Sequence, residues 1–246
     1  MIHRQVSAVF QLRDGFTGRM LPNAGGLLAR LDGAPCRPLW KQGGYWVLTD
    51  LAPGPHRLEL VLAGYRPEPV EWSWDGAAPW QGCVVLKPGQ GYPFRGDVTR
   101  LVLQLSGKNG PLAHEAVWLC TPSAAQPKLA QDKAQPGDTQ LRLYYKGPAA
   151  ALPVPGAFLL QDGGHTERIE LLRLEGEQGI LAAPLEQKHS RGRELLPAQP
   201  YTADRQGVVE ALLCQPCQLT VQCRGQVKTF DLAPGENQGQ WQLEGR

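Results

Sequence analysis

The sequence has no excess of charge of either sign and no long apolar run. Its 246 residues include 25 Lys and Arg against 23 Asp and Glu, so the net charge is +2. A chain so nearly neutral, with its charges dispersed, has no general electrostatic attraction to nucleic acid or to an anionic membrane surface. No apolar run approaches the roughly 20 residues that span a bilayer as a helix. We therefore expect no nucleic acid partner and no membrane insertion.

A secretory signal peptide is also missing from the sequence. The first residues, MIHRQVSAVFQLRDG, lack the apolar core and the small-residue cleavage site of such a signal. We therefore expect the chain to be cytoplasmic, where cysteines stay reduced. The six cysteines are Cys36, Cys83, Cys120, Cys214, Cys217 and Cys223.

Helical periodicity is absent as well. No stretch long enough for an amphipathic helix keeps a 3.6-residue apolar period, and the best candidate, residues 124–133, is interrupted by Pro127. In its place, 22 Pro and 29 Gly are spread through the chain and separate short alternating runs. This is typical of many short antiparallel strands. With 42% hydrophobic residues available to form cores, the sequence predicts an all-β fold.

One pattern of strand, turn and strand occurs twice. Residues 43–65 (GGYWVLTDLAPGPHRLELVLAGY) place a Gly before an alternating run, then a turn with Pro, then a second alternating run. Residues 206–225 (QGVVEALLCQPCQLTVQCRG) repeat that order. The stretches before them are also similar, because residues 102–105 (VLQL) repeat residues 9–12 (VFQL), including the Gln. We interpret each pattern as a hairpin in a unit that is used twice.

The repeat predicts how the chain is divided. Residues 1–96 are expected to form a first antiparallel β-sandwich, and residues 97–120 with 200–246 a second. Residues 121–199 would interrupt the second sandwich as an insert, in which Asp162, Gly163 and Gly164 mark a hairpin turn.

Residues 44–54 (GYWVLTDLAPG), with Gly64 and Tyr65 after the next run, resemble the carboxypeptidase-regulatory-like domain. In the second copy, Gln215-Pro216-Cys217 stands where that family has Pro-Gly. The resemblance implies two prealbumin-like (transthyretin-like) sandwiches that serve as scaffolds or spacers, with Tyr45 buried. The name of the family does not imply peptidase activity.

The insert carries a second resemblance. Its succession of PGAFLLQDGG, ERIELL and ILAAPLEQKHSRG, within residues 155–192, resembles small β-barrel modules of phage-tail and phage-tail-like proteins. The resemblance implies a small barrel closed by residues 184–192, with His189 bonded to its own loop. Together the two resemblances imply a component of a bacterial contractile phage-tail-like injection particle. Its partners would be tube, sheath, baseplate or cap proteins in a symmetric oligomer, assembled in the cytoplasm or later released with the particle.

Two groupings of His and Glu are candidates for acid–base chemistry or for half a metal site. One joins His165 to Glu167 and Glu170, and the other joins His165 to His189 and Glu186. Neither is accompanied by a nucleophile, a phosphate-binding loop or a third ligand in a recognisable motif. A solvated strand edge is the simpler interpretation, so we expect no enzymatic activity and no cofactor.

Metal-ligand spacing occurs at Cys214-x-x-Cys217, with Cys223 and Cys120 as further candidate ligands. Structural zinc sites usually take two such pairs, and this sequence has one. Strand alternation places Cys217 and Cys223 on one face, where Cys behaves as a small buried apolar residue. We favour buried free thiols and keep zinc as the alternative.

Trp72, Trp74 and Trp80 are the candidates for an interaction surface, with Trp40, Tyr45 and Trp46 as further aromatic residues. Alternation places Trp72 and Trp74 on one face of a strand, and Trp80 follows in a loop that predicts its exposure. An aromatic platform would suit a protein or a sugar, whereas packing in a core explains the same pattern. The alternatives to a particle component are therefore a surface adhesin or carbohydrate-binding β-sandwich protein and, third, a hydrolase with a regulatory sandwich.

Overall fold

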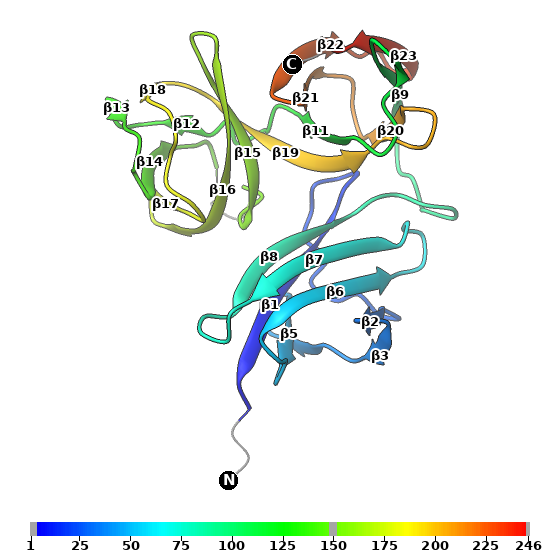
Figure 1. Cartoon of the computed structure of the whole chain (residues 1–246), viewed down its shortest axis with the longest axis vertical. Helices are drawn as coiled ribbons and strands as arrows, with labels where there is room; N and C mark the ends of the chain where they lie inside the picture. Colours follow the sequence, from blue (N-terminus) through cyan, green and yellow to red (C-terminus); the bar gives the residue numbers. More distant parts are fainter. Residues whose placement is uncertain (1–3, 148–151, 245–246) are drawn as a thin grey trace. The chain divides into compact units, whose positions relative to one another are not determined.

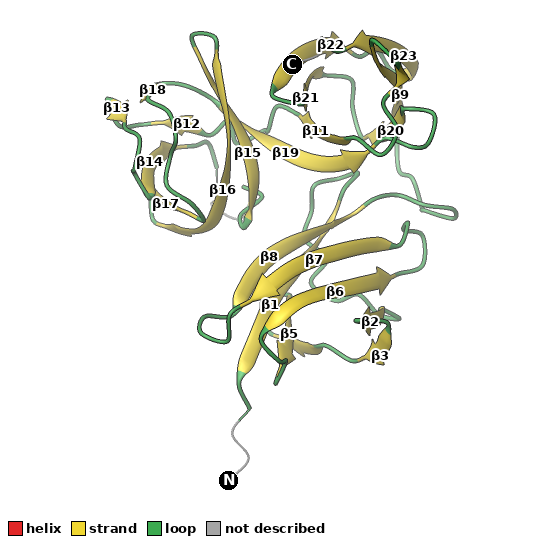
Figure 2. Ribbon diagram, viewed as in Figure 1, coloured by secondary structure: helices red, strands yellow, loops and turns green. Residues whose placement is uncertain are grey.

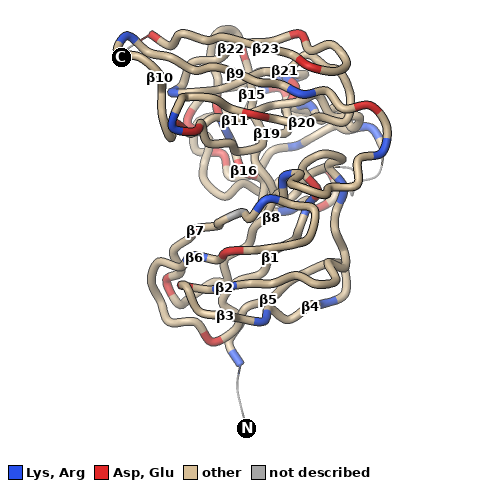
Figure 3. Tube along the Cα trace, turned by 90° about the vertical axis from the view of Figure 1, so that its right-hand side faces the viewer, with Lys and Arg blue, Asp and Glu red and all other residues tan. Residues whose placement is uncertain are grey.

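The computed structural model describes residues 4–147 and 152–244. Those residues form strands joined by turns and contain no helix (Figures 1 and 2), which confirms the predicted all-β class. The chain divides into two compact units, residues 1–95 and 96–246. In each unit, basic and acidic residues are scattered along strands and loops without separation by sign (Figure 3).

The first unit is built from two four-stranded sheets. Its strands are β1 (Val6–Asp14), β2 (Leu28–Leu31), β3 (Ala34–Cys36), β4 (Leu39–Lys41), β5 (Tyr45–Thr49), β6 (Gly54–Val61), β7 (Glu68–Trp74) and β8 (Trp80–Leu86). One sheet has the order β4-β5-β1-β8 and the other the order β3-β2-β6-β7. All neighbours are antiparallel except β1 and β8, which run parallel.

An apolar core joins these two sheets. Phe10 and Leu12 of β1 are at most 1% exposed, as are Leu58 and Leu60 of β6 in the other sheet. Their spacing of two residues follows from the pleat of a strand, which sends every second side chain to the same face. Because both sheets supply side chains to a single core, the first unit is a β-sandwich.

The second unit is larger and holds the remaining strands. These are β9 (Thr99–Gly107), β10 (Gly110–Pro111), β11 (Ala116–Cys120), β12 (Lys128–Leu129), β13 (Lys133–Ala134), β14 (Gln140–Tyr144), β15 (Gly156–Asp162), β16 (His165–Glu175), β17 (Gln178–Leu181), β18 (His189–Ser190), β19 (Leu195–Thr202), β20 (Val208–Leu213), β21 (Gln218–Cys223), β22 (Gln226–Asp231) and β23 (Gly235–Gln242). One sheet contains β10, β20 and β23 around β9, and a nine-stranded sheet has the order β12-β14-β17-β16-β15-β19-β11-β21-β22.

The nine-stranded sheet contributes to two separate cores. Its β19-β11-β21-β22 end packs against β9, β20 and β23, with Leu103 and Val221 in the shared core. Its other end curls on itself around a core that includes Phe158 and Leu171. A bridge between Lys128 and Glu194 connects the β12 end of the curl to the residue before β19, so the curl closes into a small barrel.

Strand β19 belongs to both parts of the second unit. Its Leu195 lies in the core of the barrel and its Tyr201 in the core of the sandwich. The domain boundary predicted between residues 199 and 200 therefore falls inside a continuous strand. The barrel and the sandwich are two regions of one sheet, and an extended strand of eight residues is long enough to reach from one core to the other.

The internal repeat is visible in the strand pairing. β1 lies between antiparallel β5 and parallel β8, and β9 lies in the same way between β20 and β23. Gln11 is opposite Tyr45 and Gln104 is opposite Val208, so the glutamines noted in the sequence occupy equivalent positions. Gly82 and Gly239 are equivalent too, because they lie beside Phe10 and Leu103, the residues before the two glutamines.

The two glutamines make the same hydrogen bond. Gln11 Nε2 donates to the carbonyl oxygen of Gly43 at 3.3 Å, and Gln104 Nε2 donates to that of Gln206 at 2.8 Å. Each acceptor comes directly before the glycine that precedes the next strand, Gly44 or Gly207. Both glycines have positive φ, +78° and +77°, where a residue without Cβ is favoured. The repeated Gln and Gly therefore fix the backbone conformation of the turn that leads into β5 in the first copy and into β20 in the second.

The predicted hairpins are wrong. β5 pairs with β1 and β4, whereas β6 pairs with β2 and β7, so residues 50–53 carry the chain from one sheet to the other. β20 and β21 are likewise in different sheets. The physical reason is that each alternating run has one apolar side. The apolar sides of the two runs cover the same core, but they do so from opposite sheets. Alternation within a run records which face is buried and not which neighbour it pairs with.

We expect Gly207→Ala to destabilise the second unit by roughly 3 kcal/mol. A left-handed residue with a Cβ costs about 1–2 kcal/mol, and a Cβ at Gly207 would also lie 2.6 Å from the Leu105 oxygen and 2.9 Å from the Leu112 nitrogen. Gly192→Ala is the matched control, because Gly192 has φ +82° with nothing within 4 Å of its Cβ position. Urea denaturation measures both variants, and equal losses would contradict the close packing around Gly207.

Candidate functional site

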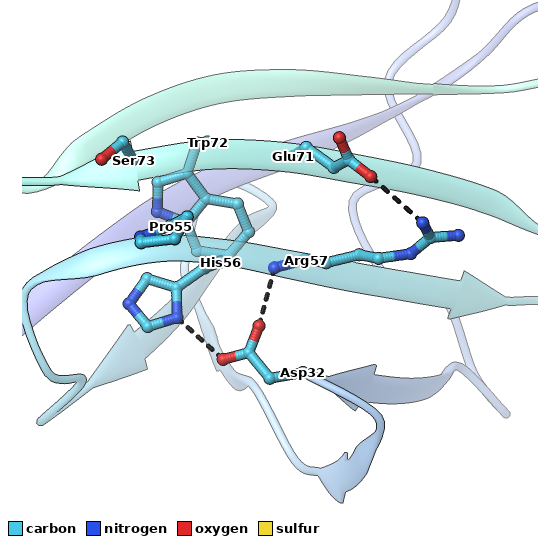
Figure 4. A pocket seen from close by; sticks show the side chains of 7 residues that line it. All are labelled: Asp32, Pro55, His56, Arg57, Glu71, Trp72 and Ser73. Carbon is cyan, nitrogen blue, oxygen red and sulfur yellow. Dashed lines mark hydrogen bonds and ion pairs between the residues drawn. The ribbon is translucent and has the colours of Figure 1, made fainter.

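A shallow pocket with a volume of about 420 Å³ opens on the β3-β2-β6-β7 sheet of the first unit (Figure 4). β6 and β7 supply most of its lining, and Asp32, in the turn between β2 and β3, supplies the rest. The lining residues are Asp32, Pro55, His56, Arg57, Glu71, Trp72 and Ser73. The pocket combines an imidazole, two carboxylates, a guanidinium and a hydroxyl, which makes it the first place to look for chemistry.

His56 uses both of its ring nitrogens inside the fold. Nδ1 lies 2.8 Å from Asp32 Oδ2, and Nε2 lies 2.8 Å from the carbonyl oxygen of Ala52. A carbonyl oxygen can only accept, and an ionised carboxylate can only accept as well. Both nitrogens therefore donate, and the ring that fits this site best is the doubly protonated imidazolium.

The pKa values of this pair move apart. The pKa of Asp32 is lowered, chiefly by the hydrogen bond from the Arg57 backbone N–H and next by the one from His56. Burial alone would lower the pKa of His56, but its hydrogen bonds to Asp32 and to the Ala52 carbonyl together outweigh burial and raise it. Both shifts favour the ion pair, which joins the turn after β2 to strand β6.

This arrangement acts as a structural staple between the turn and the strand. With both nitrogens donating, the imidazole has no lone pair left to take a proton from Ser73. The guanidinium of Arg57 is also engaged, because its Nη1 lies 3.1 Å from Glu71 Oε1 on the exposed surface. The four charged groups of the pocket are thus engaged in two ion pairs, whereas the buried Nε1 of Trp72 has no hydrogen-bond partner among the described residues.

The structure joins His189 to Glu167, a combination that the sequence did not predict. His189 Nε2 donates to Glu167 Oε2 at 2.8 Å, and the two side chains are 0% and 7% exposed. Glu167 also accepts the backbone N–H groups of Glu186, at 2.7 Å, and Gln187, at 3.1 Å. Through Glu167, this buried pair holds the loop before β18 against β16. His189 was expected to bond its own loop, and it acts on that loop through a carboxylate of another strand.

The other members of the two predicted groupings lie apart from this pair. The side chain of Glu186 is exposed, and only its backbone N–H reaches Glu167. His165 is exposed at the start of β16, and Glu170 lies on the opposite face of that strand from Glu167. Spacing along one strand suggested that His165 pairs with Glu167. Glu167 pairs instead with His189, which is 22 residues away in the sequence, and no local pattern indicates this pair.

A buried carboxylate in the first unit was also missed. Asp14, 6% exposed, accepts the backbone N–H groups of Phe16 and Thr17 with one oxygen and the hydroxyls of Tyr65 and Tyr92 with the other. Burial, followed by the charge and hydrogen bond of Asp14, raises the pKa of both tyrosines. Asp14 thereby ties the residues after β8 to the end of β1. Its partners are far away in sequence, so no motif could reveal them.

The candidate zinc ligands do not converge. Cys120 packs with Leu159 on one face of the nine-stranded sheet, whereas Cys223 lies in the sandwich core on the other face. Cys214 is exposed, and Cys217 is half-buried next to that core. Burial raises the pKa of Cys120 to about 12 and that of Cys223 to about 11. Within the described ranges no group of three or more His, Cys, Asp or Glu could hold a metal ion.

The tryptophan candidates contribute to the core of the first unit. Trp72 and Trp74 are 8% and 3% exposed. Trp80, predicted to be exposed, is half-buried and stacks on Trp72 with ring centroids 5.0 Å apart. Its ring lies over Gly82 of its own strand, where a Cβ would be 2.5 Å away. Of the two alternatives left open for these residues, the structure shows packing in a core for Trp72 and Trp74, because the face that they share is internal.

Within the described part of the chain, two of the exposed aromatic residues lie on the neighbouring strands β4 and β5, and the others are Phe94 and Tyr144. Trp40 is 49% exposed and Tyr45 is 43% exposed. The expectation that Tyr45 is buried is wrong, because alternation sends Trp46 to the core and Tyr45 to the opposite face. Trp40 is anchored at its polar end, since Nε1 donates to the carbonyl oxygen of Pro22.

No family model matches the sequence, and no curated protein matches it. Among solved structures, the chain is similar to the major pilin subunit of Bacillus cereus, BcpA*(D312A), at 8% identity, with 98% of this chain and 99% of that chain covered and a TM-score of 0.26. It is also similar to the Bacillus anthracis TIE protein at 9% identity, with 98% of this chain and 51% of that chain covered and a TM-score of 0.26. TM-scores this low do not establish a common fold. The described residues also include no helix long and apolar enough to cross a membrane.

The staple between His56 and Asp32 predicts a dependence of stability on pH. Because the pKa of His56 is raised above its ordinary 6.5, its contribution is complete below pH 6.5 and is lost as the pH rises through the higher folded-state value. Because the pKa of Asp32 is lowered from 3.8, its contribution is complete above pH 3.8 and is lost as the pH falls through the lower value. Urea denaturation at a series of pH values from below 3.8 to above 6.5 measures the free energy of unfolding, and Asp32→Asn serves as the comparison. An identical pH profile for both proteins would contradict the staple.

We expect Glu167→Ala to destabilise the second unit by about 3 kcal/mol, because it leaves a buried His and two backbone N–H groups without their acceptor. Glu186→Ala is the matched control, since that side chain is exposed, and it should change the free energy of unfolding by less than about 0.5 kcal/mol. Equal effects in denaturation experiments would show that the Glu167 carboxylate does not hold the loop.

Proposed function

We propose that this protein is a non-enzymatic structural component of a contractile phage-tail-like particle, where it docks rigid β-modules on other particle proteins. The observation that carries the proposal is the repeat of one module in equivalent register. The order β5-β1-β8 of the first unit recurs as β20-β9-β23 in the second. A repeated module with no chemistry of its own suits a spacer or a docking element.

The side chains with catalytic potential support this proposal because they are engaged within the fold. His56 donates from both nitrogens, and Glu167 accepts hydrogen bonds from His189 and from two backbone N–H groups. Asp14 accepts hydrogen bonds from four donors within the fold. Each of these groups stabilises a loop, which is the use expected in a scaffold.

The assignment to a phage-tail-like particle rests on the resemblance of the insert to small barrels of tail proteins. The closed curl of β12, β14, β17, β16, β15 and β19 suits such a module. In this proposal the partners are tube, sheath, baseplate or cap proteins arranged with symmetry. Assembly takes place in the cytoplasm.

Sedimentation of a native lysate tests the particle assignment. The tagged chain should travel with a heavy tail-like particle and appear on imaging as a ring, cap or fibre density. The control is the same tagged chain produced in a host without particle genes, where it should remain light. If the chain also stays light in its native host under conditions that preserve the particles, the assignment is wrong.

A surface adhesin is the second candidate, favoured by the exposure of Trp40 on β4; Tyr45 is exposed on the other face of this sheet, because Trp40 lies opposite Trp46. An aromatic residue half open to solvent can stack on a sugar ring. Glycan binding that is abolished by Trp40→Ala, with the fold retained, would favour this candidate over the particle component. Leu28→Ala serves as the control, because Leu28 is 67% exposed but is not aromatic.

A further inference from the structure

The two copies of the module differ at one sheet edge. In the first copy β5 has β1 on one side and β4 on the other. In the second copy β20, which is equivalent to β5, pairs with β9 on one side and with no other described strand. The position that β4 occupies in the first copy is therefore vacant in the second.

The connection that leads into β20 explains the vacancy. In the first copy the chain passes from β3, which pairs with β2, through β4 and into β5. In the second copy β19 takes the part of β3, since it pairs with β11 as β3 pairs with β2. From β19 the chain enters β20 after residues 203–207 alone. No residues remain between them to form a counterpart of β4.

The backbone of β20 shows which groups face the vacancy. Leu105 N donates to the Gly207 carbonyl, so the odd-numbered residues of β20 exchange hydrogen bonds with β9 and the even-numbered ones point outward. Val208, at the start, is covered by its own loop, because Asp204 N donates to its carbonyl at 2.9 Å and its N–H donates to Asp204 Oδ1 at 2.8 Å. The N–H and C=O of Leu212, farther along, point toward the open position.

The composition of β20 lacks the usual protection of an edge strand. Edge strands commonly carry Lys or Pro, which prevent pairing with another chain, and β4 has both, as Lys41 and the preceding Pro38. β20 reads VVEALL, with neither. Its acidic residue, Glu210, bonds Arg100 of the neighbouring strand at 2.7 Å. β8 also lacks Lys and Pro, but it packs beside β7 of the facing sheet.

We propose that the open edge of β20 binds β20 of a second copy of this chain, with the two strands antiparallel. A second copy fits better than a foreign strand for two reasons. Pairing across a two-fold axis covers both open edges in one contact. The apolar strand also presents no pattern of charge that would select a different partner, because Glu210 is neutralised within its own sheet. The proposal concerns the isolated chain and holds whether or not the particle assignment is correct.

Sedimentation equilibrium of the purified full chain, over a range of concentrations, tests the proposal. The wild type should dimerise. Leu212→Lys, which adds a charge at the edge, and Leu212→Pro, which removes an outward N–H, should each weaken dimerisation by about tenfold or more, or about 1.4 kcal/mol. Leu28→Lys is the matched control, because it adds the same charge at an exposed Leu of β2, a strand paired on both sides.

Circular dichroism and urea denaturation establish that each variant is folded before its association is compared. Hydrogen exchange gives a second measurement, in which the amide of Leu212 should exchange more slowly as the wild-type concentration rises. A wild type that is monomeric at every concentration overturns the proposal. A dimer that Leu212→Lys and Leu212→Pro weaken no more than Leu28→Lys overturns it as well.

Discussion

Each module depends on its first strand, which pairs with another strand along both of its edges. β1 and β9 are the central strands of their sheets, and their core-facing side chains are almost completely buried, as Phe10 and Leu103 illustrate. The last strand of each module runs parallel to the first. A parallel pair needs a long connection, so everything between the first and last strand must be accommodated within the module. The second module includes a whole barrel in that connection without changing the pairing of β9.

The buried polar groups have a common role in this architecture. Each of three polar residues fixes a loop against a strand through several hydrogen bonds. Asp14 and Glu167 accept these bonds, and His56 donates them. A sandwich with many turns has many backbone groups that need partners, and a single side chain that satisfies two or three of them stabilises a turn efficiently. What looks like catalytic potential in the sequence is, in the structure, the reinforcement of loops. This use of polar groups is the one we propose for a scaffold.

Local patterns in the sequence were sufficient for part of this account. Alternation identified the all-β class, and the shared VFQL and VLQL stretches identified the equivalent strands β1 and β9. Alternation could not tell that β5 and β6 lie in opposite sheets, because both give an apolar face to the same core. It could not tell that Trp72 faces inward, since a platform and a core produce the same spacing. The pair of His189 and Glu167 was out of reach because it depends on how β16 and the loop before β18 meet in space.

Hydrogen exchange of the whole chain tests the central claim, that two copies of one module are each built on their first strand. The account predicts that, within each unit, the slowest amides belong to β1 and β9, around Phe10 and Leu103, with similar protection at Gln11 and Gln104. If β9 exchanged as fast as the edge strands of its sheet while β1 stayed protected, the second unit would not be built on the same plan and the account would be wrong.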